Sequence, residues 1–149
     1  MDTIYDILSK EHQILIGMFN EAMITGSKEA LFRIKAEIDP HMAGEEKFFY
    51  PRLEEKEESE GIAHKANIEH NEAKALMIEM EGMQEGDENW AIMLKELKDV
   101  IMHHINEENE VFKVFSRVLS REETEEIAQK YLEFKRNYTA KMETGQSLA

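Results

Sequence analysis

The chain has 149 residues, of which 42% are hydrophobic and 34% are charged, so it is long enough for one globular domain and too apolar to remain disordered. Its 18 basic and 32 acidic residues give a formal net charge of −14, which repels phosphate backbones and anionic lipids and argues against nucleic-acid and membrane partners. The lack of cysteine excludes disulfides, thiolate metal sites and cysteine nucleophiles. Histidine and carboxylate are therefore the strong metal ligands that remain.

The composition favours helices, and the lack of targeting signals favours a cytoplasmic location. The chain contains only 2 Pro and 7 Gly, and Leu, Ile, Met, Glu and Lys are abundant, as is typical of helical proteins. The N-terminus has neither the basic start nor the apolar stretch of a signal peptide, and no run of apolar residues is long enough to span a bilayer.

Apolar residues recur at helical spacing in two segments of the first half. Thr3 is a suitable N-cap for a helix that runs to about residue 24, where Gly26-Ser27 interrupts the pattern. Ser27 can cap a second helix that runs to about Leu53. Because Pro40 lies inside this second pattern, we expect a kink or a restart there, with Asp39 as the cap.

The second half repeats this organisation and adds a shorter helix. A third helix is expected after Gly61, ending at the polar turn 85–87, and a fourth from Trp90 to about Leu119. Ser120-Arg121-Glu122-Glu123 has the form of a capping box, so we expect a short fifth helix over 121–138 and a frayed tail from about residue 141.

These elements predict an all-α fold. Four long helices joined by short turns form an up-down-up-down four-helix bundle most economically. We therefore expect one domain over residues 1–149, with the bundle over about 3–119 and a short C-terminal fifth helix packed across one end.

Four histidines replace apolar residues on the expected inward stripes of four different helices: His12, His41, His70 and His103. Two of them have a glutamate four residues later, His41 with Glu45 and His103 with Glu107, and residues four apart share a helix face. A neighbouring pair, His104 and Glu108, lies about 100° further around the helix, and we place that pair beside the core rather than in it.

Six buried polar groups need partners, and a dinuclear metal centre would satisfy all of them. The imidazoles would be terminal ligands and the two glutamates bridges. This donor set suits iron best, then manganese, and zinc third because the HExxH pattern is lacking. The Glu-x-x-His motif of ferritin-like di-iron proteins is also lacking. The alternative is that the histidines and glutamates satisfy one another without a metal.

The sequence resembles the hemerythrin-like family, the HHE cation-binding domain, over nearly the whole chain to about Leu119. Its pattern is His, His-x-x-x-Glu, His, His-x-x-x-Glu, and the matching segments are Glu11-His12-Gln-Ile-Leu15, His41-Met-Ala-Gly-Glu45-Glu46-Lys-Phe-Phe-Tyr50-Pro51, Glu69-His70-Asn-Glu-Ala73 and His103-His-Ile-Asn-Glu107-Glu108-Asn-Glu-Val-Phe112.

The resemblance implies a four-helix bundle around two iron ions, bridged by an oxo or hydroxo group and by two carboxylates. Aligning Tyr50 with Phe112 selects His103 and Glu107 over His104 and Glu108. Oxygen carriers of the family place two histidines four residues apart on the third helix, whereas here the positions around His70 are Ala66 and Lys74.

This departure implies a more open iron and favours sensing or redox chemistry. We expect His64 to be solvated, with a role as an extra ligand as the alternative. Glu37 and Asp99, each four residues before a proposed ligand, are candidate acceptors for the outer imidazole N–H, although a solvated helix face is the preferred explanation.

Three functions remain open. The first is binding of O2 or NO for sensing, storage or delivery, which for a sensor needs a separate protein partner. The second is an enzyme that turns over peroxide or NO, or an iron donor for cluster repair. The third is a metal-free helical interaction domain. The sequence favours the first, without a catalytic role.

Overall fold

Helices account for most of the chain. The computed structural model describes residues 1–145, and no strand occurs among them, so the expected all-α class is confirmed. In chain order the helical elements are α1 (Ile4–Thr25), α2 (Lys28–Gly44), the π-helical turn η1 (Glu45–Phe49), α3 (Tyr50–Glu54), α4 (Glu57–Glu81), α5 (Trp90–Val118) and α6 (Arg121–Thr144).

Capping residues fix the helix starts as expected. The Thr3 hydroxyl accepts from the backbone N–H of Asp6, whose carboxylate accepts from the backbone N–H of Thr3. Ser120 and Glu123 form the same reciprocal pair at the start of α6. Each pair satisfies donors that the first helical turn leaves free.

Three boundaries differ from the expectation. Helix α2 continues through Pro40 to Gly44, so the expected restart at Asp39 is wrong, and the irregular turn comes later, at Glu45–Phe49. Helix α4 begins at Glu57, because the acidic residues before Gly61 suit a first helical turn. Helix α6 extends to Thr144; of the expected frayed tail, residues 146–149 lie outside the described residues.

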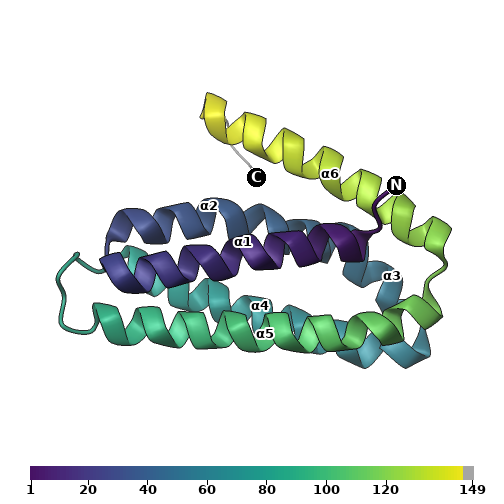
Figure 1. The fold of residues 1–149 in the computed structure, drawn as a ribbon, viewed down its shortest axis with the longest axis horizontal. Helices are drawn as coiled ribbons and strands as arrows, with labels where there is room; N and C mark the ends of the chain where they lie inside the picture. Colours follow the sequence, from purple (N-terminus) through teal and green to yellow (C-terminus); the bar gives the residue numbers. More distant parts are fainter. Residues whose placement is uncertain (146–149) are drawn as a thin grey trace.

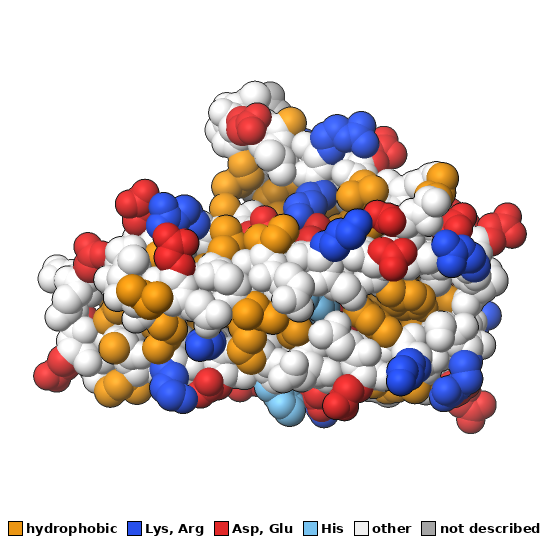
Figure 2. All heavy atoms as spheres, viewed as in Figure 1, with side chains coloured by type: hydrophobic (Ala, Val, Ile, Leu, Met, Phe, Trp, Pro, Cys, Tyr) orange, Lys and Arg blue, Asp and Glu red, His pale blue; other side chains and the backbone are white. Residues whose placement is uncertain are grey.

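Figure 1 shows α1, α2, α4 and α5 side by side along the long axis of the molecule, with the chain turning at alternate ends. Helices α4 and α5 contact each other, as do α1 and α2, and α1 also contacts α5. Helix α6 packs on α1, α2 and η1. Acidic and basic side chains are intermixed on the face drawn in Figure 2.

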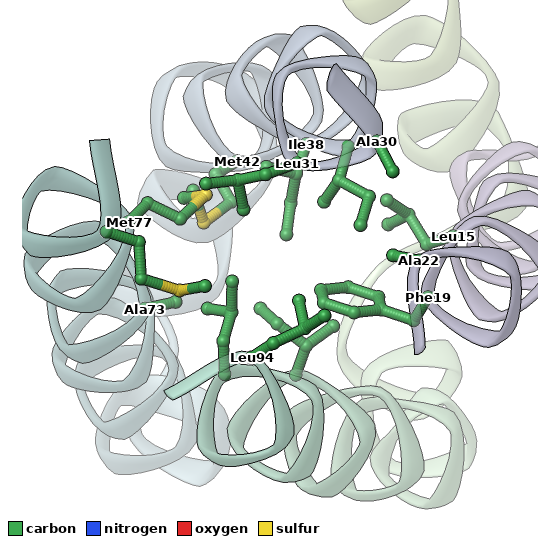
Figure 3. Close-up of a cluster of buried hydrophobic side chains, with 14 of the residues drawn as sticks. Leu15, Phe19, Ala22, Ala30, Leu31, Ile38, Met42, Ala73, Met77 and Leu94 are labelled. Carbon is green, nitrogen blue, oxygen red and sulfur yellow. The ribbon is translucent and has the colours of Figure 1, made fainter. Parts of the chain in front are cut away.

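The buried side chains form two separate apolar clusters. One cluster includes side chains from the second half of α1 and the first half of α5, such as Phe19 and Leu94 (Figure 3). The other contains the start of α1 and the end of α5, including Leu8 and Phe115. Where the two clusters meet, both helices bury polar residues, Glu11 and His12 on α1 and His104 and Glu108 on α5, so a polar layer crosses the bundle between two apolar ends.

Candidate metal centre

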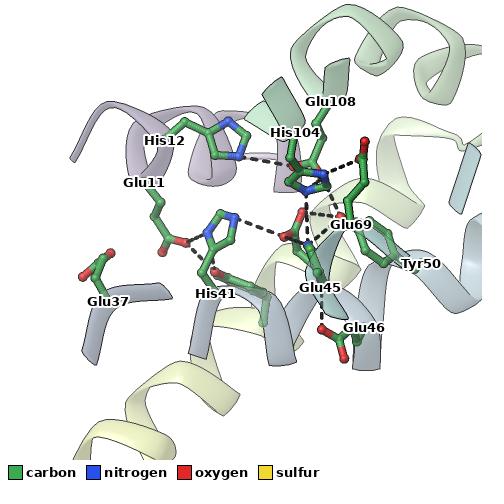
Figure 4. A network of polar contacts seen from close by, with 12 residues as sticks. Glu11, His12, Glu37, His41, Glu45, Glu46, Tyr50, Glu69, His104 and Glu108 are labelled. Atoms are coloured by element: carbon green, nitrogen blue, oxygen red, sulfur yellow. Dashed lines mark hydrogen bonds and ion pairs between the residues drawn. The ribbon is translucent and has the colours of Figure 1, made fainter. Parts of the chain in front are cut away.

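Six buried polar residues from five helical elements meet in this layer (Figure 4). Each is at most 6% exposed, and they come from α1, α2, η1, α4 and α5: His12, His41, Glu45, His70, His104 and Glu108. The structure therefore brings together four of the six residues expected from the sequence, which are His12, His41, Glu45 and His70.

The expected orientation of the other two is wrong. The side chain of His103 is 65% exposed and that of Glu107 is 33% exposed, whereas His104 and Glu108 are buried. His103 and Glu107 form a separate surface group with Glu69, and Lys65 is paired with Glu107 there at 2.5 Å.

The π-helical turn explains this error. Tyr50 follows Glu45 by five residues and donates its backbone N–H to the Glu45 carbonyl. Its ring lies against His70, as the Phe112 ring lies against His12. Phe112, however, follows Glu108 by only four residues, within a regular helix. Aligning Tyr50 with Phe112 without the extra residue of the π turn therefore shifts the histidine by one position.

The inner nitrogens of the four imidazoles face the two carboxylates. Glu45 Oε1 lies 3.1 Å from His41 Nε2 and 3.3 Å from His70 Nε2. Glu108 Oε1 lies 3.3 Å from His12 Nε2, and its Oε2 lies 3.4 Å from His104 Nε2. Each glutamate therefore contacts one histidine of the α1–α2 hairpin and one of the α4–α5 hairpin, and is placed where it could bridge two ions.

The outer nitrogens have partners of their own. His41 Nδ1 lies 2.7 Å from Glu11, His70 Nδ1 2.8 Å from Glu46, and His104 Nδ1 2.8 Å from Glu69. His12 Nδ1 lies 3.2 Å from the side-chain oxygen of Asn109. When an imidazole is neutral, as a metal ligand must be, these oxygens can accept its Nδ1 proton, which would leave each Nε2 with a lone pair directed into the polar layer.

Glu37 and Asp99, the sequence-based candidates for this role, pair with lysines instead. Glu37 lies 3.2 Å from Lys135, and Asp99 pairs with Lys95 at 2.8 Å on the surface. His64 is exposed. The repeated Glu-His pairs at 11–12 and 69–70 were the signal that could have identified Glu11 and Glu69.

The carboxylates raise the proton affinity of the buried histidines. Burial alone would lower the pKa of His41, but Glu45 and Glu11 outweigh burial and raise it to about 10. His104 follows the same pattern, since Glu108 and Glu69 raise its pKa to about 10 against the effect of burial. This polar layer therefore attracts positive charge strongly, whether as protons or as metal ions.

Neutral imidazoles would leave the layer composed of acceptors. His12 Nε2, Glu45 Oε1 and Glu108 Oε1 are buried and have no hydrogen-bond partner. Unpaired buried acceptors are costly, and facing lone pairs need a cation between them. The residues present therefore fit a metal centre, and two groups of ligand atoms lie close enough to hold one ion each: His12, His41 and Glu108; Glu45, His70 and His104.

A cavity of about 170 Å³ opens between α4 and α5 and reaches this layer. Its inner end is formed by Tyr50, His104 and Glu108. Apolar side chains line much of its wall, among them Ile62 and Val111. A small uncharged molecule can therefore approach the donor atoms from this side.

The profile of the Hemerythrin HHE cation binding domain matches residues 3–115. The chain belongs to this hemerythrin family. The match covers all six buried donors and ends before α6, so α6 lies outside it. Comparison with curated proteins and with solved structures gives no match. Among the described residues, no helix has an apolar stretch long enough to cross a membrane.

Proposed function

We propose that the chain is a non-haem di-iron protein that binds O2 or NO in an up-down-up-down bundle, for sensing, storage or delivery. The observation that carries this proposal is the set of four Nε2 atoms around two carboxylates that each contact both hairpins. Such a set matches two octahedral ions with terminal imidazoles and bridging carboxylates. The proposed ligands are therefore His12, His41, Glu45, His70, His104 and Glu108.

Iron fits this donor set because imidazole and carboxylate together suit redox-active ions that accept six ligands. When bound, iron would supply reversible electron donation to O2 or NO. The protein's own contribution is to orient the imidazoles through Glu11, Glu46 and Glu69 and to limit water access by the apolar clusters on both sides.

The first test is the metal content of protein loaded anaerobically with ferrous iron, measured by elemental analysis. We expect two iron ions per chain. A matched variant, His70→Ala, should lose at least one ion, whereas His64→Ala on the same helix should keep both, because His64 is exposed. A chain that binds no iron would contradict the proposal, and a metal-free interaction domain would be the remaining alternative.

The second test separates ligand binding from turnover. We expect the visible spectrum of the ferrous protein to change on addition of O2 or NO and to return when the gas is removed. An irreversible change with consumption of peroxide or NO would instead favour the enzyme alternative. Transfer of the iron to an acceptor protein would favour the iron donor.

A further inference from the structure

Tyr50 places a hydroxyl inside the polar layer. The residue is 1% exposed, and the π-helical turn holds it one turn beyond Glu45. Its hydroxyl is positioned to donate to Glu108 Oε2 at 2.6 Å or to Glu45 Oε2 at 3.1 Å, and it lies 3.3 Å from His70 Nε2. It therefore contacts both carboxylates that we propose as bridges and one of the imidazoles.

The hydroxyl has the spacing of a ligand. Adjacent ligands of an octahedral ion, with bonds near 2.1 Å, are about 3 Å apart. His70 Nε2 and His104 Nε2 are 3.1 Å apart, and His70 Nε2 is 3.3 Å from Glu45 Oε1. The hydroxyl of Tyr50 has these same separations from His70 and Glu45. It therefore lies among the donor atoms, not behind them.

Tyr131 provides the contrast. It is also buried and also close to a histidine, but its hydroxyl lies 3.4 Å from the outer nitrogen of His41 and donates to Glu11. The imidazole ring therefore separates this hydroxyl from the inner donor atoms. The hydroxyl of Tyr131 therefore lies outside the set of inner donor atoms, whereas that of Tyr50 lies within it.

We propose that Tyr50 is a direct ligand of the ion held by His70 and His104, an inference that rests on the proposed dinuclear site. Coordination forms a bond between the phenolic oxygen and the ion and breaks the O–H bond, and the proton leaves to solvent. No electron is transferred. An anionic oxygen ligand favours ferric over ferrous iron, so this half of the centre would be the harder one to reduce.

The cavity between α4 and α5 places Tyr50 where it can affect the binding of small molecules. Because Tyr50 forms part of its inner end, a small molecule that enters there competes with the phenolic oxygen for a position on the ion. If Tyr50 instead only donated a hydrogen bond to an incoming molecule, it would strengthen the binding of that molecule.

The test uses iron-loaded, air-oxidised full chain. A ferric phenolate has a broad visible charge-transfer band, and excitation into it enhances ring vibrations of the phenolate in the Raman spectrum. We expect this band in the native protein and in the control Tyr138→Phe, whose ring packs against Phe134 within α6, and its loss in Tyr50→Phe with two iron ions retained. Azide should bind to Tyr50→Phe more tightly than to the native protein.

The possible results are distinguishable. Two iron ions without a phenolate band, a band that survives in Tyr50→Phe, or weaker azide binding in that variant would overturn the ligand assignment and leave the di-iron centre intact. No bound iron in the native protein would overturn both proposals. If Tyr50→Phe loses iron, Tyr50→His, which restores a donor, should recover the metal without the phenolate band.

Discussion

Glu11 hydrogen-bonds to His41 on the next helix, at 2.7 Å, rather than to its neighbour His12. The second hairpin repeats this arrangement, since Glu69 bonds to His104 at 2.8 Å. Each hairpin thus joins its own two helices through one carboxylate and one imidazole. The other outer bonds cross between hairpins, from Glu46 to His70 and from Asn109 to His12. The polar layer therefore links all four long helices.

The Glu11→Gln variant should weaken metal binding. The substitution removes the charge that stabilises the Nδ1 proton of His41, and loss of such a partner lowers metal affinity by about 10–100-fold. Iron affinity can be measured by competition with a chelator. Glu37→Gln is the control, because Glu37 also pairs with Lys135 but does not bond to a histidine. Equal effects of the two variants would contradict the assigned role of Glu11.

The adjacent histidines of α5 test the corrected register. His104→Ala removes a donor whose inner nitrogen lies 3.1 Å from that of His70, so we expect loss of at least one iron ion per chain. His103→Ala changes an exposed side chain and should leave the iron content unchanged. Elemental analysis of the iron content of both variants distinguishes His104 from His103 as the ligand. Iron loss from His103→Ala alone would restore the sequence-based choice.

The fold could be predicted from the sequence because helical periodicity and caps are local signals. The stripe through Leu8, His12 and Leu15 and the capping box at Ser120 have direct counterparts in the structure. The continuity of α2 through Pro40 was not predictable in the same way, since packing of its flanking residues Ile38 and Met42 in the core outweighs one lost hydrogen bond.

The site was predicted only in part. His12, His41, Glu45 and His70 were placed correctly in the layer by their position on apolar stripes. The choice between His103 and His104 depended on a π-helical turn in the other hairpin, for which no local sequence signal was identified. The outer partners depended on contacts between helices, and an acidic residue on a helix face is usually solvated. Spacing alone therefore could not select Glu46 over Glu37.

The metal-free protein should lose stability as the pH rises. The pKa values of His41 and His104 are about 10 in the folded protein, above the ordinary 6.5. Their contribution to stability is therefore complete below about pH 6.5 and is lost as the pH rises through 10. Thermal unfolding followed by circular dichroism should show a falling Tm over this range in chelator-treated protein.

Iron-loaded protein should behave in the opposite way over the same range. Its imidazoles bind metal in the neutral form, so binding releases protons and affinity rises with pH. The difference in Tm between loaded and metal-free protein should thus widen from about pH 6.5 to 10. A constant difference would mean that the histidines do not exchange protons for metal.

Gly44→Ala should destabilise the protein by separating α6 from the bundle. Gly44 ends α2, and a β-carbon there would overlap the ring of Tyr131 on α6. Because Tyr131 is fully buried and donates to Glu11, the ring cannot move aside without disturbing the partner of His41. Overpacking of this kind costs about 1–3 kcal/mol. Urea unfolding of the metal-free protein measures the change.

Gly17→Ala is the matched control for this effect. Gly17 lies within α1, and a β-carbon there would meet no atom within 4 Å. Alanine at such a helical position should stabilise the protein by about 0.5–1 kcal/mol. Iron affinity should fall in Gly44→Ala and stay constant in Gly17→Ala, because only the first displaces Tyr131 and, through it, Glu11. If both variants were stabilised to the same extent, the close packing of α6 on Gly44 would be wrong.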